Sequence, residues 1–155
     1  MRDRTVCFTG HRKIPAGQYD ILLQRLKDTI VHLISRGYRF FGTGGALGFD
    51  TMAAQAVLEL RKQYPHIRLI LVLPCLAQAK SWNASDRAIY EHIKGQADKI
   101  VYTSLANTRG CMHRRNRHLV DCSSVCICYM TESTGGTAYT VSHAQKQGLE
   151  IINIA

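Results

Sequence analysis

The sequence has no apolar run near the length that a membrane-spanning helix needs, which is about 20 residues. Its N-terminus, Met1-Arg2-Asp3-Arg4, is charged and leads straight into a strand-like run, so the apolar core of a secretory signal is lacking as well. These two absences predict that the protein has no membrane partner and stays in the cytoplasm.

Acidic side chains are scarce, because 11 Asp and Glu stand against 20 Lys and Arg and leave a formal net charge of +9. Such an excess favours anionic partners, either nucleic acid or a phosphorylated small molecule, although a solvated basic surface explains it equally well. Aromatic residues make up only 8% of the chain and do not alternate with basic residues. Stacking platforms for single-stranded nucleic acid normally show that alternation, so nucleic acid is the weaker expectation.

The six cysteines lack the paired short spacings of a zinc site or a disulfide framework. Cys7, Cys126 and Cys128 lie in apolar, strand-like runs, where a free cysteine behaves as a small hydrophobic residue. We therefore expect no metal and no required cofactor. Free thiols also suit a reducing compartment.

No internal repeat, low-complexity tract or linker interrupts the chain, and its 155 residues are enough for one domain with a buried core. Strand and helix patterns alternate instead. Strands are predicted at residues 5–9, 38–43, 67–73, 99–102, 125–129 and 149–154, and helices at 18–36, 50–64, 84–95, 108–121 and 136–147. This alternation predicts an α/β fold, a Rossmann-like three-layer sandwich with a mainly parallel, doubly wound sheet, formed by residues 1–155 as a single domain.

Four groups of unusual residues directly follow predicted strands. Because the carboxyl ends of parallel strands share one edge of the sheet, these groups should converge there on a ligand site. They are Thr9-Gly10-His11-Arg12, the stretch Gly42 to Asp50 with Gly44, Gly45, Ala46 and Gly48, the trio Pro74, Gln78 and Trp82, and the stretch Glu132 to Thr137 with Gly135 and Gly136.

Two of these groups are rich in glycine and open a helix. Glycine lets the backbone approach an anion closely, and a helix N-terminus offers free N–H groups and a positive dipole end. Tight strand-to-helix turns also use glycine, but two such loops at one edge favour phosphate binding. Neither loop ends in the Gly-Lys-Ser/Thr of a triphosphate P-loop, and the first strand does not lead into Gly-x-Gly-x-x-Gly.

The helix predicted over residues 108–121 carries an arginine on its inner face. A spacing of 3.6 residues per turn puts Arg115 and Asn116 on the side that packs on the sheet, while Arg114 and Arg117 point elsewhere. An inward arginine without a partner is costly. The partner of Arg115 is either a buried carboxylate, from Asp50 or Asp121, or the phosphate or carboxylate of a ligand.

Several single residues have two interpretations each. Asp50 either caps the helix predicted over residues 50–64 or holds a ribose hydroxyl, and Thr108 is the predicted cap of the later helix. Trp82, the only tryptophan, either stacks on a base or packs against the protein. His11 is most simply a polar pocket residue rather than a catalytic base.

These motifs, in this order, resemble the SLOG superfamily, which joins Smf/DprA-type and Lonely Guy-type proteins, and they are most similar to its YpsA-like branch. The resemblance covers nearly the whole chain. It rests on Thr9-Gly10-His11-Arg12, Gly44-Gly45-Ala46-Leu47-Gly48-Phe49-Asp50, Arg115-Asn116 with Asp121, and Gly135-Gly136-Thr137. It implies a modified Rossmann fold that binds nucleotides or nucleotide-derived molecules, in proteins that pair as dimers.

Lonely Guy enzymes hydrolyse cytokinin nucleoside monophosphates to the free base and ribose phosphate. Their helix motif Met-His-x-Arg-Lys is similar to residues 112–116 up to its last position, so Arg115 falls on the family's catalytic arginine. The catalytic glutamate of the family falls on Thr140 or on Ser142, depending on how the second glycine-rich loop is aligned. Neither is acidic, which argues against hydrolysis.

The first functional prediction is a binding protein or sensor for a nucleotide or nucleotide-sugar, such as an ADP-ribose-like molecule, whose phosphates lie on the two glycine-rich loops and Arg115. The alternative is an N-glycosidic hydrolase of Lonely Guy type, with Asp50, Glu132 and Arg115 as catalytic candidates. A second alternative is single-stranded DNA binding of DprA type. The predicted ligand-binding residues are Thr9, Gly10, His11, Arg12, Gly44, Gly45, Ala46, Gly48, Asp50, Trp82, Arg115, Asn116, Gly135, Gly136 and Thr137.

Overall fold

The computed structural model describes residues 1–155, which form a six-stranded sheet flanked by helices. In chain order the elements are η1 (Arg2–Arg4), β1 (Thr5–Gly10), η2 (Ala16–Gln18), α1 (Tyr19–Ser35), β2 (Phe40–Thr43), α2 (Phe49–Arg61), β3 (Arg68–Leu73), α3 (Ala84–Gln96), β4 (Lys99–Tyr102), α4 (Cys111–Asp121), β5 (Val125–Tyr129), α5 (Gly136–Lys146) and β6 (Glu150–Asn153).

All neighbouring strands run parallel, in the order β4-β3-β2-β1-β5-β6. The predicted α/β, Rossmann-like fold with a doubly wound parallel sheet is confirmed. β1 and β5 lie side by side, with Cys7 opposite Cys126. The chain adds strands on one side of β1 up to β4 and then returns to its other side. The carboxyl ends of β1 and β5 are therefore the topological switch point, where such sheets bind ligands.

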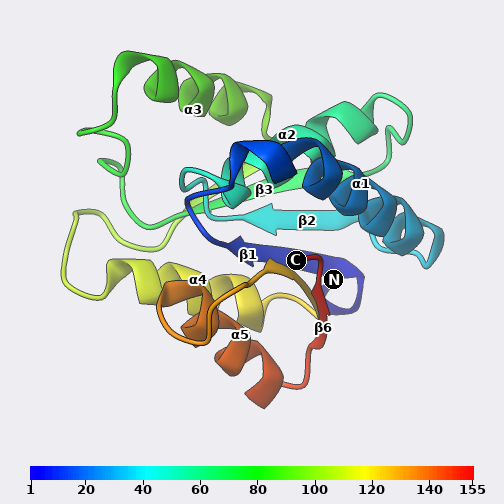
Figure 1. Cartoon of the computed structure of the whole chain (residues 1–155). Helices are drawn as coiled ribbons and strands as arrows, with labels where there is room; N and C mark the ends of the chain where they lie inside the picture. The colour runs from blue at the N-terminus through cyan, green and yellow to red at the C-terminus, as the bar shows by residue number, and fades with distance from the viewer.

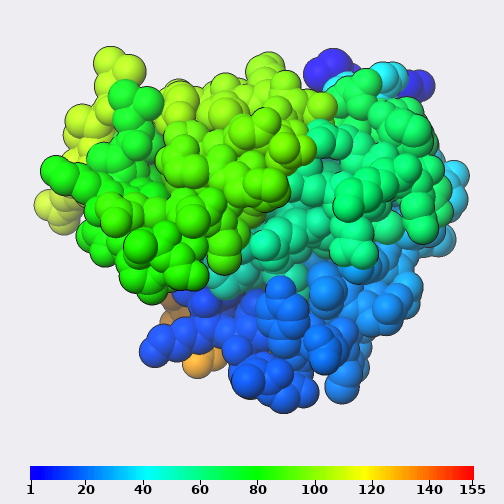
Figure 2. Space-filling view, turned by 90° about the horizontal axis from the view of Figure 1, so that it is seen from above, coloured from blue at the N-terminus to red at the C-terminus, as the bar shows by residue number.

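The helices form two outer layers around the sheet. α1, α2 and α3 cover one face, and α4 and α5 cover the other (Figure 1). Figure 2 looks onto the first of these faces, where blue α1, cyan α2 and green α3 form the outer surface. Phe8, Phe41 and Phe49 belong to the larger core cluster, which includes residues of α1 and α2, while Cys7 and Cys126 belong to a smaller cluster with residues of α4 and α5.

The predicted cap Thr108 is wrong, and of the two interpretations of Asp50 the structure contradicts the helix cap. α4 follows Gly110, whose φ is 80°, and Thr108 lies outside the helix. α2 follows Gly48, whose φ is also 80°, so Asp50 lies inside the first turn and its carboxylate accepts a hydrogen bond from the Ala46 N–H at 3.2 Å. At each entry the chain makes a bend with positive φ, which glycine adopts without the strain that a side chain would bring.

The other predicted boundaries lie within three residues of the observed ones. The largest difference is the end of α2 at Arg61, before the turn that leads to Pro65. No helix of the structure has both the length and the apolar character that crossing a membrane requires.

Five of the six free cysteines are buried, and only Cys122 is exposed. Burial raises the pKa of the Cys128 thiol to about 11. A hydrogen bond with Cys7, together with burial, raises the pKa of Cys126. Burial raises the pKa of the Cys122 thiol as well, so exposure rather than pKa distinguishes it from the others. We expect iodoacetamide at about pH 8 to label Cys122 alone in the folded protein, because the reagent does not reach the buried thiols, and to label every cysteine after denaturation. Peptide mass spectrometry measures this, and rapid labelling of Cys126 or Cys128 in the folded state would contradict the described packing.

Candidate functional site

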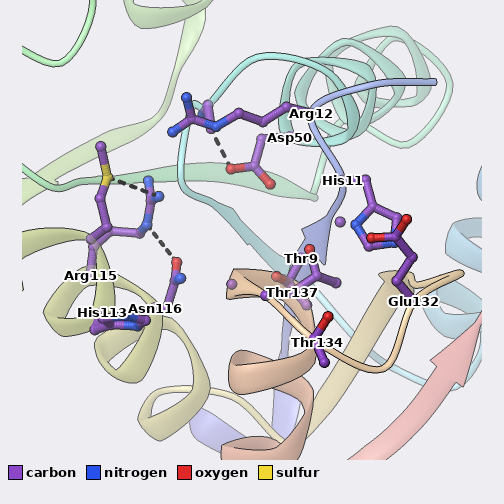
Figure 3. A pocket seen from close by; sticks show the side chains of 15 residues that line it. Thr9, His11, Arg12, Asp50, His113, Arg115, Asn116, Glu132, Thr134 and Thr137 are labelled. Carbon is purple, nitrogen blue, oxygen red and sulfur yellow. Dashed lines mark hydrogen bonds between the residues drawn. The ribbon is translucent and has the colours of Figure 1, made fainter.

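A cavity of about 460 Å³ opens at the carboxyl ends of β1 and β5, a volume typical of small-molecule sites. Its walls come from β1, the start of α2, the inner side of α4 and the loop between β5 and α5 (Figure 3). Only two of its lining residues are hydrophobic, which suits a polar or charged ligand. The lining residues are Thr9, Gly10, His11, Arg12, Ala46, Asp50, Met112, His113, Arg115, Asn116, Glu132, Thr134, Gly135, Gly136 and Thr137.

The structure brings most of the predicted ligand-binding residues to this cavity. Those that line it are Thr9, Gly10, His11, Arg12, Ala46, Asp50, Arg115, Asn116, Gly135, Gly136 and Thr137. Glu132, named as a catalytic candidate, lines it too. The predicted residues that do not line it are Gly44, Gly45, Gly48 and Trp82.

The N-terminus of α5 faces the cavity, and its first backbone N–H groups have no side-chain cap. Its N-cap residue Gly135 has a φ of 99°, and no side chain caps the helix. A Cβ atom added at Gly135 or Gly136 would meet no heavy atom within 4 Å, so the space beside these two glycines is open. The first backbone N–H groups of a helix lack partners inside it and carry the positive end of its dipole. This end of the cavity has the chemistry of an anion site.

Arg115 brings a buried positive charge to the opposite wall, where it is 4% exposed. Its guanidinium donates hydrogen bonds to the Gly44 backbone oxygen, to Asn116 Oδ1 at 2.7 Å and to Gln78 Oε1 at 3.4 Å. Burial lowers its pKa, and the negative charge of Asp50 opposes that effect. Neutral groups thus fix the guanidinium in place at the cavity wall.

No carboxylate forms a direct ion pair with Arg115. Asp121, one of the two partners considered from the sequence, instead contacts His143 Nε2 at 3.0 Å on α5. Asp50 acts on Arg115 through its charge without such a contact. The positive charge of Arg115 is therefore not neutralised by a paired carboxylate, which leaves it available to a ligand anion.

Asp50 is the one buried carboxylate of the protein and is 8% exposed. Burial raises its pKa, while the charge of Arg115 and the hydrogen bond from the Ala46 N–H act in the opposite direction. It lines the same cavity as the N-terminus of α5, so the cavity holds an oxygen acceptor as well as an anion site. Such an acceptor can bind a hydroxyl of a sugar.

In the loop before α2, other parts of the protein fill the space beside two of the glycines. A Cβ atom at Gly44 would collide with the Arg115 guanidinium, and one at Gly48 would collide with the backbone of Arg12. These two glycines make room for neighbouring chain segments rather than for a ligand. From this loop only Ala46 reaches the cavity, together with Asp50 in the first turn of α2.

Trp82 packs edge-to-face against Tyr90, with ring centroids 5.1 Å apart, next to the larger core cluster. His11 and Glu132 both line the cavity (Figure 3). The Thr131 N–H donates to His11 Nε2 at 2.9 Å, so the neutral ring carries its proton on Nδ1.

Met112, His113 and Thr134 also line the cavity, although they were not predicted from the sequence as ligand-binding residues. Helix periodicity indicates the first two, because Met112 lies three residues before Arg115 and His113 lies three residues before Asn116. Residues at this spacing share one face of a helix. Gln78 does not line the cavity, but it supports Arg115 from behind and donates to the Gly44 oxygen at 3.2 Å.

The family model YpsA, described as the YspA SLOG family, matches residues 6–152 of the chain. The chain belongs to this family. The resemblance drawn from the motifs is thereby confirmed. Among the SLOG relatives, the uncharacterized SPbeta prophage-derived protein YoqJ of Bacillus subtilis is 31% identical over 140 residues, which cover 79% of this chain and 81% of YoqJ.

Two UPF0398 proteins are also similar to this SLOG chain. The protein of Brevibacillus brevis is 28% identical and matches over 82% of this chain and 69% of its own length. The protein of Bacillus cereus is 23% identical, over 94% of this chain and 84% of its own.

Two solved structures of DNA processing protein A share the fold of this SLOG chain. The Helicobacter pylori protein, described with a unique single-stranded DNA binding mode, has a TM-score of 0.66 and 17% identity, over 95% of this chain and 63% of that one. The Streptococcus pneumoniae protein has a TM-score of 0.64 and 15% identity, over 96% of this chain and 49% of that one. The chain thus spans less than two thirds of either protein, and at these identities the likeness shows the fold alone.

Proposed function

We propose that this SLOG protein binds a nucleotide or nucleotide-derived small molecule, such as an ADP-ribose-like compound. The observation that carries the proposal is the N-terminus of α5, which no side chain caps and where Gly135 and Gly136 line the cavity with open space beside them. A phosphate there would accept hydrogen bonds from the first backbone N–H groups of the helix.

The other groups of the cavity complement this role. Arg115 adds a positive charge that no carboxylate pairs with, and exposed Arg12 adds a second one at the rim. Asp50 supplies an acceptor for a ribose hydroxyl. A site with cations for phosphate, one buried acceptor for a sugar and few apolar residues fits the phosphorylated part of a nucleotide.

An N-glycosidic hydrolase is the second candidate, because Glu132 and Asp50 both line the cavity. A carboxylate near the reacting sugar could stabilise its oxocarbenium ion and activate water. The two positions aligned with the Lonely Guy glutamate do not supply one. The Thr140 hydroxyl donates to the Gly136 backbone oxygen at 3.0 Å, and Ser142 is exposed on α5 and does not line the cavity. We therefore favour binding over turnover.

Single-stranded DNA binding is supported by the net charge of +9 and by the likeness to a protein whose structure is described with that binding mode. His113, Arg114 and Arg117 are exposed on α4, and His113 lines the cavity. DNA binding predicts an affinity that falls steeply as salt rises, since each phosphate contact releases counterions.

Nucleotides are expected to stabilise the folded protein against heat. A ligand at one hundred times its Kd adds about 2.7 kcal/mol to the free energy of unfolding, which for a chain of this size raises the Tm by about 5–10 °C. The measurement is differential scanning fluorimetry with AMP, ADP, NAD and ADP-ribose, followed by chromatography of each mixture. Free base in the mixture would favour the hydrolase. A shift with an oligonucleotide alone, lost at high salt, would favour DNA binding, and no shift with any nucleotide would contradict the proposal.

A further inference from the structure

A second cavity, of about 320 Å³, adjoins the first one and shares Arg12 with it. It lies between the segment that follows β1 and helices α2 and α3, on the face where the blue N-terminal segment meets the cyan and green helices in Figure 2. The loop before α2 lines both cavities. Its residue Ala46 faces the first, as Asp50 of α2 does, and Leu47 and Gly48 face the second.

The second cavity differs from the first in its chemistry, because half of its lining is apolar. The hydrophobic lining residues are Ile14, Tyr19, Leu47, Met52 and Ile89. Tyr19 of α1 and Ile89 of α3 are 39% and 37% exposed, although they are large and apolar. Exposed apolar side chains from different elements that gather around one cavity mark a binding site.

Two polar side chains in this cavity are free to recognise a ligand. Gln55 of α2 and Asp86 of α3 line it, and no hydrogen bond or ion pair of the structure uses either side chain. A glutamine amide offers one donor group and one acceptor, the pair presented by the edge of a base, and a carboxylate accepts from an exocyclic amino group. Arg12 adds a planar guanidinium that can stack on a flat ring.

The first cavity, in contrast, has only two hydrophobic lining residues. It therefore offers a phosphate and a sugar their partners but offers little apolar surface to a base. The neighbouring apolar cavity supplies that surface on the other side of Arg12.

We propose that the second cavity holds the base of the nucleotide whose phosphate lies at α5, an inference that rests on the function proposed above. The apolar side chains contact the faces of the base, and Gln55 and Asp86 contact its edge. The ribose passes from one cavity to the other over Arg12, the residue that lines both. The occupant is a purine that carries an exocyclic amino group, as in AMP.

The test compares AMP with ribose 5-phosphate, which keeps the sugar and phosphate but has no base. Both are titrated by calorimetry into the wild-type protein, into Ile89→Ser and into Ile21→Ser. Ile21 is a matched control, because it is an exposed isoleucine of a helix, 58% exposed, outside both cavities. We expect the wild type to bind AMP at least about tenfold more tightly than ribose 5-phosphate, and Ile89→Ser to lose about tenfold in AMP affinity alone. Ile21→Ser should change neither affinity.

The outcomes separate this inference from the function on which it rests. Equal affinities of the wild type for AMP and ribose 5-phosphate would leave phosphate binding in place and overturn the base site. Equal losses for both ligands in Ile89→Ser would overturn it as well. Failure of both ligands to bind the wild type would overturn the proposed function, and the base site with it.

Discussion

Arg115→Ala is expected to abolish nucleotide binding, whereas Arg117→Ala leaves the Kd within about twofold of the wild-type value. The two arginines lie on the same helix and carry the same charge. Arg115 is 4% exposed and lines the cavity, while Arg117 is exposed and donates to the Tyr139 hydroxyl at 3.0 Å. A charge-assisted hydrogen bond from a buried guanidinium to phosphate is stronger than one in water, so its removal weakens binding severely. Isothermal titration calorimetry with AMP measures both variants.

Arg115→Ala also removes contacts inside the protein, so its stability needs its own measurement. The Gly44 oxygen keeps the hydrogen bond from Gln78 Nε2, but Gln78 Oε1 loses its donor, which costs about 1–3 kcal/mol for an unsatisfied buried group. Circular dichroism must therefore show a folded protein at the titration temperature. Arg115→Lys is the second variant, because it keeps the charge but loses the planar fork, and we expect it to bind more weakly than the wild type and more tightly than Arg115→Ala. Equal losses in Arg115→Ala and Arg117→Ala would show that the cavity does not bind the nucleotide.

The inward position of Arg115 could be predicted from the sequence because helix geometry alone determines it. A period of 3.6 residues separates the inner face of α4 from its outer face without any knowledge of the neighbouring elements. The alternation of strands and helices likewise predicted the parallel sheet, and with it the edge at which loops distant in sequence meet. These predictions depend on repeated local patterns, which a single unusual residue does not change.

The separate roles of the glycines could not be predicted in the same way. A glycine-rich loop looks the same in sequence whether the missing side chain makes room for a ligand or for the protein. Gly44 makes room for Arg115 and Gly48 for the backbone at Arg12, while Gly135 and Gly136 border open space. Which of these applies depends on the tertiary neighbours of each glycine, and the same holds for Trp82, whose contact with Tyr90 comes from an element later in the chain.

Gly136→Asp is expected to lower nucleotide affinity by about a hundredfold or more, because two like charges ~4 Å apart repel by ~4 kcal/mol at an effective dielectric constant of ~20. The new carboxylate would stand at the first position of α5, where a Cβ atom meets no heavy atom within 4 Å, so the fold accommodates it. It would also occupy the site proposed for the phosphate. The same charge interacts favourably with the helix dipole and stabilises the folded protein by about 0.3–1 kcal/mol. Binding and stability should therefore change in opposite directions.

Gly136→Asp should lower the affinity while it raises the stability, so unfolding cannot explain the loss of affinity. A destabilising substitution would not allow this distinction. Ala84→Asp is the matched control, since Ala84 is the exposed first residue of α3 and lines neither cavity. It introduces the same charge at the same position of another helix and is expected to leave the affinity for AMP unchanged. Calorimetry gives the affinities and thermal unfolding gives the stabilities. If Gly136→Asp bound AMP as tightly as Ala84→Asp, the phosphate would not lie at the N-terminus of α5, and the site would have to be sought around Arg12 instead.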